Sequence, residues 1–270
     1  MELNNIQSVY FIGAGGIGMS CLLRYFLFLG KTVGGYDRTP TPLTAELQKE
    51  GALLHFTDDP GQIPPAFRRK ESTLVVFTPA IPEDHRELRY FRRTGFEIHK
   101  RAQVLGTITR ATRALCVAGT HGKTTTSTML AHLLRCALPE GCTAFLGGIS
   151  QNYHSNLILP PKESPFTVIE ADEFDRSFHW LQPEMAVVTA TDADHLDIYG
   201  TPEAYVESFR YFTSLIRPSG VLLLHEGTAL RPDLQPGVRL YSYARTSGDF
   251  HAEHIEAGGG EIRFDLVAPA

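Results

Sequence analysis

Gly119-Thr-His-Gly-Lys-Thr-Thr-Thr126 is the stretch from which the fold of this chain can be worked out. It follows an apolar run, Ala114–Ala118, and it precedes apolar residues at helical spacing between positions 129 and 134. This order of strand, glycine loop and helix presents backbone N–H groups and a helix N-terminus to phosphate oxygens. The stretch therefore predicts an ATP-binding phosphate loop.

Side chains of this loop have their own expected roles. Lys123 can place a positive charge on the terminal phosphates, and Thr124 can offer a hydroxyl to Mg²⁺. The usual pattern has a glycine five residues before Gly122, where this chain has Val117, so Gly119 marks a shorter variant. His121 could contact phosphate or simply be a loop residue. The predicted ATP-binding residues are Gly119, Thr120, His121, Gly122, Lys123, Thr124 and Thr125.

A second glycine motif, Gly13-Ala-Gly-Gly-Ile-Gly18, follows the apolar run Ser8–Ile12 and precedes a helical pattern. Asp37 stands 19 residues past Gly18, at the end of the next expected strand. This spacing is typical of dinucleotide sites, in which a glycine turn receives the phosphates and a carboxylate binds a ribose. The spacing leaves open a nicotinamide or flavin enzyme, a nucleotide-sugar site and a structural turn.

Acidic side chains follow two further apolar runs. Glu170-Ala-Asp-Glu-Phe-Asp175 comes after Phe166–Ile169, and Thr191-Asp-Ala-Asp-His-Leu-Asp197 comes after Met185–Thr189. Strand ends carry the ligand chemistry of α/β proteins, and clustered carboxylates repel one another unless a cation lies among them. Each run alone could be a solvated loop. Beside a phosphate loop, imidazole and carboxylates indicate divalent metal ions.

The order of the expected elements indicates an α/β protein with parallel sheets. In the first part we expect strands at 8–12, 31–36, 52–56, 73–77 and 96–99, with helices at 19–29, 43–50 and 85–93. In the second part we expect strands at 115–118, 166–169, 185–189 and 221–224, a helix at 203–216 and hairpins in the last 35 residues. This predicts a Rossmann-like domain over 1–106 and a P-loop α/β domain over 107–270.

Composition excludes several classes of protein. The 270 residues carry a net charge of −5 without a basic stripe, so nucleic acid is not an expected partner. The arginine-rich segment 86–101 also contains acids and is expected to be a solvated helix face. No apolar segment approaches the roughly 20 residues of a membrane span. The four cysteines are not at metal-ligand spacing, and they fit a reducing cytoplasm.

The complete set of motifs resembles the Mur ligases, and within them the alanine-adding branch. The set comprises both glycine loops, Glu170-Ala-Asp-Glu173 and Asp194-His-Leu-Asp197, and the resemblance extends over essentially the whole chain. Further matching segments are Gly15–Ser20, Arg101–Leu105, Ser177–Pro183 and Asp194–Tyr199. The resemblance implies ATP-driven amide formation in peptidoglycan precursor synthesis. The lactyl carboxylate of UDP-N-acetylmuramate would become an acyl phosphate, which the amine of L-alanine would attack.

The resemblance also assigns roles to residues, and it implies that the first glycine loop binds UDP instead of NAD. Lys123, Glu170 and His195 would be catalytic, and Thr124, Glu170 and His195 would hold two Mg²⁺ ions. The implied UDP-sugar site comprises Gly13, Gly15, Gly16, Ile17, Gly18, Asp37, Thr78, Ala80 and Ile81.

Three departures from the family pattern stand out. Thr189-Ala190 occupies the place where the family usually has Thr-Asn. No lysine follows Lys162, so the carbamylated lysine of several Mur ligases has no counterpart here. The family's third, C-terminal ligase domain is also absent from the 270 residues, so we expect a truncated central domain.

Four functions are therefore compatible with the sequence. The leading one is the alanine-adding ligase. The others are the related recycling ligase that attaches a peptide, an NAD(P)-dependent oxidoreductase, and a UDP-sugar-binding fragment without turnover. The oxidoreductase would explain Gly13–Gly18 but not Gly119–Thr126, and we expect this chain to bind UDP-N-acetylmuramate with little turnover by itself.

Overall fold

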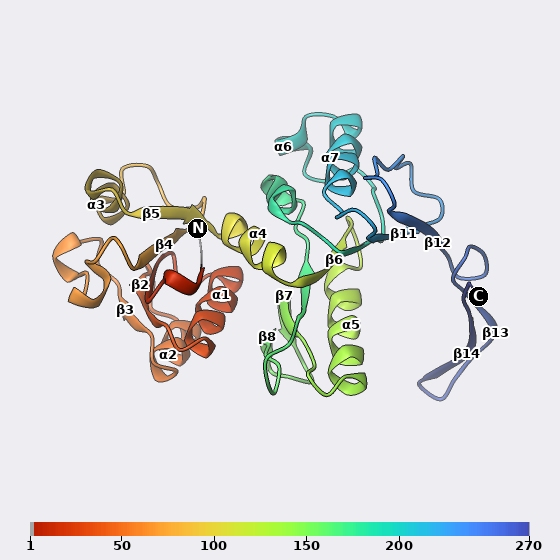
Figure 1. Ribbon diagram of the computed structural model, residues 1–270, viewed down its shortest axis with the longest axis horizontal. Helices are drawn as coiled ribbons and strands as arrows, with labels where there is room; N and C mark the ends of the chain where they lie inside the picture. Colours follow the sequence, from red (N-terminus) through yellow and green to blue (C-terminus); the bar gives the residue numbers. More distant parts are fainter. Residues whose placement is uncertain (1–2, 270) are drawn as a thin grey trace. The chain divides into compact units, whose positions relative to one another are not determined.

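A computed structural model describes residues 3–269 and confirms the α/β class (Figure 1). The chain forms two compact units. The first contains Met1–Ile108 and Thr143–Lys162, and the second contains Thr109–Cys142 and Glu163–Ala270. Within residues 3–269, no helix combines the length and the apolar character needed to cross a membrane.

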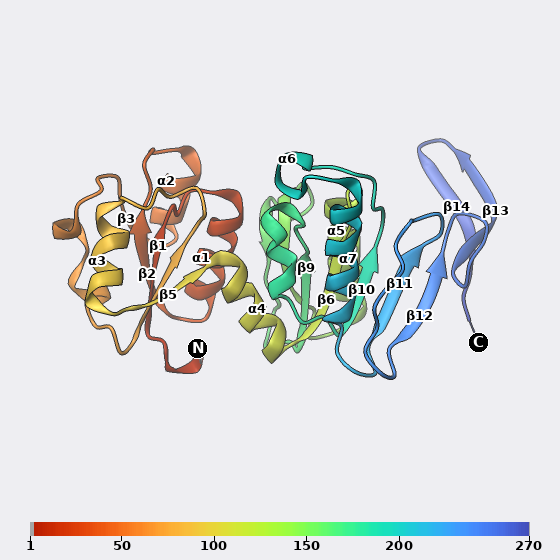
Figure 2. The same ribbon diagram turned by 90° about the horizontal axis from the view of Figure 1, so that it is seen from above.

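The first unit is built on a parallel sheet with the strand order β3-β2-β1-β4-β5 (Figure 2). Each expected strand and helix of this part is confirmed, with bounds shifted by no more than a few residues. Its elements are β1 (Ser8–Ile12), α1 (Ile17–Phe28), β2 (Thr32–Tyr36), α2 (Pro42–Lys49), β3 (Leu53–His55), β4 (Thr73–Phe77), α3 (Arg86–Thr94), β5 (Glu97–Lys100), β7 (Thr143–Ser150), β8 (Ser155–Ile158) and the short 3-10 helices η1 (Leu3–Asn5), η2 (Pro60–Gln62) and η3 (Pro65–Phe67). Helix α4 (Arg101–Ala111) contains Ile108 and Thr109, between which the first unit ends and the second begins.

Local sequence explains where these elements lie. All five residues of β1 are buried, as expected for the central strand of a parallel sheet. Helix α2 begins with Pro42 in its first turn and with Thr41, whose side chain accepts a hydrogen bond from the Thr44 amide. Helix α3 ends at Gly95, which has a φ of 77° and therefore suits a residue without a Cβ.

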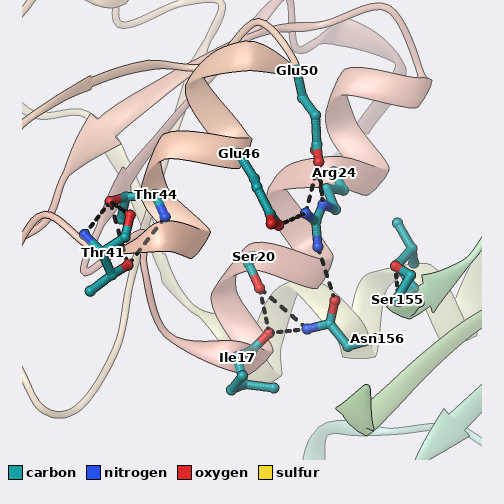
Figure 3. A network of polar contacts seen from close by, with 10 residues as sticks. Ile17, Ser20, Arg24, Thr41, Thr44, Glu46, Glu50, Ser155 and Asn156 are labelled. Carbon is teal, nitrogen blue, oxygen red and sulfur yellow. Dashed lines mark hydrogen bonds and ion pairs between the residues drawn. The ribbon is translucent and has the colours of Figure 1, made fainter. Parts of the chain in front are cut away.

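The β7–β8 hairpin was not anticipated from the sequence, and it packs with the first unit. Figure 3 shows Asn156 of β8 directed at the first turn of α1. The Asn156 amide donates to the Ile17 carbonyl (2.7 Å) and to Ser20 Oγ (3.2 Å), and it accepts from Arg24 (3.4 Å). Arg24 in turn pairs with Glu50 at 2.7 Å. The hairpin thus fixes the helix that follows the first glycine loop.

We expect Asn156→Ala to lower the free energy of unfolding by about 1–3 kcal/mol, because a buried hydrogen-bonded amide is lost and its partners are left without it. Urea denaturation measures this change. Asn152→Ala, an exposed asparagine at the turn of the same hairpin, is the control and should be neutral. Equal effects of the two substitutions would show that the Asn156 contacts do not stabilise α1.

The second unit is also a parallel α/β arrangement, with the strand order β12-β11-β10-β6-β9. Its elements are β6 (Arg113–Ala118), α5 (Lys123–Ala137), β9 (Phe166–Glu170), η4 (Phe174–Trp180), β10 (Met185–Val188), α6 (Leu196–Tyr199), α7 (Pro202–Ser214), β11 (Val221–His225), β12 (Arg239–Tyr243), β13 (His251–Gly258) and β14 (Glu261–Val267). The expected C-terminal hairpin is confirmed by the antiparallel pair β13–β14. The expectation was wrong for β12, which pairs in parallel with β11.

Strand order determines where ligands can bind in each unit. In the first unit the neighbours β2, β1 and β4 are parallel, so the loops after them meet at one edge of the sheet. In the second unit the same holds for β10, β6 and β9. These two edges carry both glycine loops and the two acidic runs singled out from the sequence.

Candidate functional site

The first unit contains a cleft of about 660 Å³ at the carboxyl ends of β1, β2 and β4. Six of the predicted UDP-sugar residues line it: Gly13, Gly16, Asp37, Thr78, Ala80 and Ile81. Gly15, Ile17 and Gly18 stand in the same loop but are not among its lining residues. A cleft of this size at this sheet edge is suited to a nucleotide.

Asp37 is held in place by backbone groups. Its Oδ2 accepts from the Gly15 amide at 2.7 Å, and its Oδ1 accepts from the Thr39 amide at 3.1 Å. Each carboxylate oxygen retains capacity for a second hydrogen bond. Asp37 is therefore oriented before a ligand arrives and can accept from a ribose hydroxyl.

Several lining residues were missed in the sequence analysis. Arg38 and Arg86 add positive charge to the cleft, and Asp58 and His85 form part of its wall. Asp58 accepts hydrogen bonds from the first amides of α3, and His85 Nδ1 accepts from the Leu88 amide at 3.3 Å. Burial lowers the pKa of His85. Only Arg38, next to Asp37, had a sequence signal that could have revealed it.

The predicted phosphate loop lies between β6 and α5, as expected. Gly122 has a φ of 80° and directly precedes the first residue of α5. Thr120 Oγ1 donates to the Asp192 carbonyl at 2.7 Å, and Thr189 Oγ1 donates to the His121 carbonyl. Contacts from the loop after β10 therefore hold the phosphate loop from one side.

Lys123 is the first residue of α5, and its ammonium group crosses the loop. Nζ donates to the Gly119 carbonyl at 2.7 Å and to Glu173 Oε1 at 2.8 Å. Glu173 is 1% exposed. Burial raises the pKa of the Glu173 carboxyl, while the Lys123 charge opposes that rise. Glu173 was quoted within an acidic run but was not predicted as a site residue.

Two of the predicted metal ligands lie together. Thr124 Oγ1 donates to Glu170 Oε1 at 2.9 Å, which brings the start of α5 to the end of β9. The hydroxyl and the carboxylate are both oxygen donors of the kind that Mg²⁺ prefers. This pair therefore fits a magnesium ion bound beside the phosphates.

His195 lies next to a different carboxylate. Its Nε2 is 4.0 Å from Glu173 Oε1 and 3.9 Å from Asp194 Oδ2. Its φ is 50°, and its ring meets Phe174 edge to face at 5.3 Å. Within residues 3–269, no group of three or more His, Cys, Asp and Glu side chains is arranged to hold a metal ion. The assignment of His195 to a metal stays a prediction.

Two family models match the chain, one over each part. The description "Mur ligase family, catalytic domain" matches residues 8–113, and "Mur ligase middle domain" matches residues 117–269. The fold indicates a class of protein in which one α/β unit has a cleft suited to a nucleotide and the next has a predicted phosphate loop. This chain belongs to the Mur ligase family.

Individual relatives give a more specific comparison than the family models do. The chain is 62% identical to the UDP-N-acetylmuramate–L-alanine ligases of Phocaeicola vulgatus and Parabacteroides distasonis, over 100% of its own length. It spans 58% of the length of each of these relatives.

Solved structures show the same fold. A crystal structure of UDP-N-acetylmuramate-alanine ligase from Thermotoga maritima has a TM-score of 0.74 and 26% identity, with 96% of this chain and 57% of that one covered. The UDP-N-acetylmuramate:L-alanyl-gamma-D-glutamyl-meso-diaminopimelate ligase of Neisseria meningitidis has a TM-score of 0.81, and the match covers 97% of this chain and 84% of that one. At 24% identity this match supports the fold alone.

Proposed function

We propose that this chain provides the UDP-sugar site and the ATP site of a ligase that joins L-alanine to UDP-N-acetylmuramate. The observation that carries the proposal is the pairing of Thr124 with Glu170 beside Lys123, in a chain whose close relatives are named as this ligase. The first-unit cleft would bind the UDP moiety. The boundary near residue 107 would separate the two functions.

Each side chain then has a physical task. A carboxylate is a poor acyl donor, because its oxygen is a poor leaving group until it is phosphorylated. Phosphoryl transfer depends mainly on positioning and charge neutralisation. The loop amides and Lys123 would hold the β- and γ-phosphates of ATP, and the γ-phosphoryl group would pass to the lactyl carboxylate. The amine of L-alanine would then attack the acyl phosphate and release phosphate.

Magnesium fits the donors at this loop. Thr124 and Glu170 would hold one ion, and Glu170 with His195 would contribute to a second. Bound Mg²⁺ would neutralise charge on the phosphate oxygens. We also propose a location in the reducing cytoplasm, which the spacing of the four cysteines and their mostly apolar sequence contexts favour.

Calorimetry with UDP-N-acetylmuramate, UDP-N-acetylglucosamine and NAD, run in parallel, tests the first site. We expect binding of UDP-N-acetylmuramate and none of NAD. Asp37→Ala should weaken UDP-N-acetylmuramate binding by roughly 10- to 100-fold, because hydrogen bonds to a charged acceptor are worth about 1.5–3 kcal/mol.

Glu71→Ala is the matched control for Asp37→Ala, since Glu71 is an exposed acid of the same unit outside the cleft. It should leave the affinity unchanged. Binding of NAD in place of the UDP sugar would favour an oxidoreductase and would overturn the proposed function.

A further inference from the structure

The carboxylate of Glu173 is more deeply buried than its position in an acidic loop suggests. Its side chain is 2% exposed, and the side chain of its partner Lys123 is 15% exposed. Its backbone carbonyl accepts from the Tyr199 hydroxyl at 2.5 Å and from the Arg176 amide at 3.0 Å. The backbone after it is constrained too, with left-handed φ values of 53° at Asp175 and 55° at Arg176. Glu173 is therefore held at a fixed place.

The two carboxylate oxygens of Glu173 differ. Oε1 accepts from Lys123, whereas Oε2 is buried without a hydrogen-bond partner in the described part of the chain. A buried acceptor without a partner costs free energy, and a structure retains one where it serves another purpose. Within residues 3–269, the hydrogen bonding of this carboxylate to another side chain is directed at Lys123 through Oε1.

The Lys123 ammonium has three N–H bonds. Two of them reach Gly119 and Glu173, which leaves one donor within the described contacts. Because Glu173 and the loop carbonyl take the first two, the direction of the third is set before any ligand binds. A lysine without Glu173 would sample several rotamers, and binding would have to overcome that entropy.

We propose that Glu173 is a positioning residue, which holds Lys123 across the phosphate loop in the geometry that receives a nucleotide phosphate. It acts through Lys123 and does not touch the metal ion. This inference rests on the proposed function, because it requires the loop to bind ATP or ADP. It gives a role to Glu173, a residue of the motif set to which the sequence analysis assigned none.

The test is ADP affinity, measured by calorimetry with this chain in excess Mg²⁺ and again in EDTA. Glu173→Ala should weaken ADP binding about tenfold in both conditions. Glu173→Gln keeps the shape and an acceptor oxygen, so it should restore part of the loss. Glu163→Ala, an exposed acid of the same unit, is the control and should have no effect. Thermal unfolding is recorded for each variant. If the alanine variant does not fold, the ADP affinity of Glu173→Gln is the test, and it should be lower than that of the unsubstituted chain.

A double-mutant cycle with Lys123→Ala, titrated to millimolar ADP, tests whether Glu173 acts through the lysine. The proposal requires that Glu173→Ala has no further effect once Lys123 is replaced. An effect that disappears in EDTA would make Glu173 a metal ligand and would overturn the proposal, as would an unchanged or a tighter affinity. Failure of the unsubstituted chain to bind ADP would instead overturn the proposed function itself.

Discussion

Lys123→Ala is expected to weaken ADP binding to this chain by roughly 10- to 100-fold, because a charged hydrogen-bond donor to the phosphates is lost. In the whole ligase, phosphate release should fall further, by roughly 10²- to 10³-fold, since the lysine stabilises charge that develops in the transition state. Calorimetry measures the first quantity, and a phosphate-release assay measures the second.

The substitution also leaves Glu173 buried without its cation, which is a cost to stability. Unfolding by urea must therefore be measured beside affinity. Lys162→Ala is the matched control, because Lys162 is exposed and lies outside the phosphate loop. Unchanged ADP affinity and unchanged phosphate release in a folded Lys123→Ala variant would remove the lysine from the mechanism.

Most of the fold could be predicted because its signals are local. Buried β-prone runs such as Thr73–Phe77, and helix starts such as Thr41-Pro42, are set by neighbouring residues. The β7–β8 hairpin could not be predicted in this way. Its strands contain two glycines at 147 and 148, and its position depends on contacts such as that of Asn156 with Ile17, 139 residues apart in the sequence.

The candidate sites also divide into residues found from local sequence motifs and residues placed by packing between distant parts of the chain. Residues in motifs were expected from spacing alone, such as Asp37 directly after β2 and Thr124 in the first turn of α5. The role of Glu173 was missed, since an acid in an acidic loop looks solvated until the structure shows it buried against Lys123. His85 was missed for a similar reason: burial and packing, which leave no sequence pattern, bring it to the cleft.

Gly119→Ala is expected to disrupt the phosphate loop. Gly119 has a φ of 140°, and a Cβ there would lie 2.1 Å from Thr189 Oγ1 and 2.9 Å from the Ala190 amide nitrogen. The second neighbour is backbone, so rotation of one side chain cannot relieve the crowding. The loop must shift, and the loss of one hydrogen bond to a charged phosphate, worth about 1.5–3 kcal/mol, corresponds to roughly a 10- to 100-fold loss of affinity. We therefore expect ADP affinity to fall by about that factor.

Gly227→Ala separates the two causes of this effect. Gly227 lies in the same unit with a φ of 84°, but no atom lies within 4 Å of the place its Cβ would take. It should cost about 1 kcal/mol of stability through backbone strain and leave ADP affinity unchanged. If Gly119→Ala binds ADP as tightly as Gly227→Ala does, then close packing of the loop against Thr189 does not govern nucleotide binding, and the shortened glycine pattern has another cause.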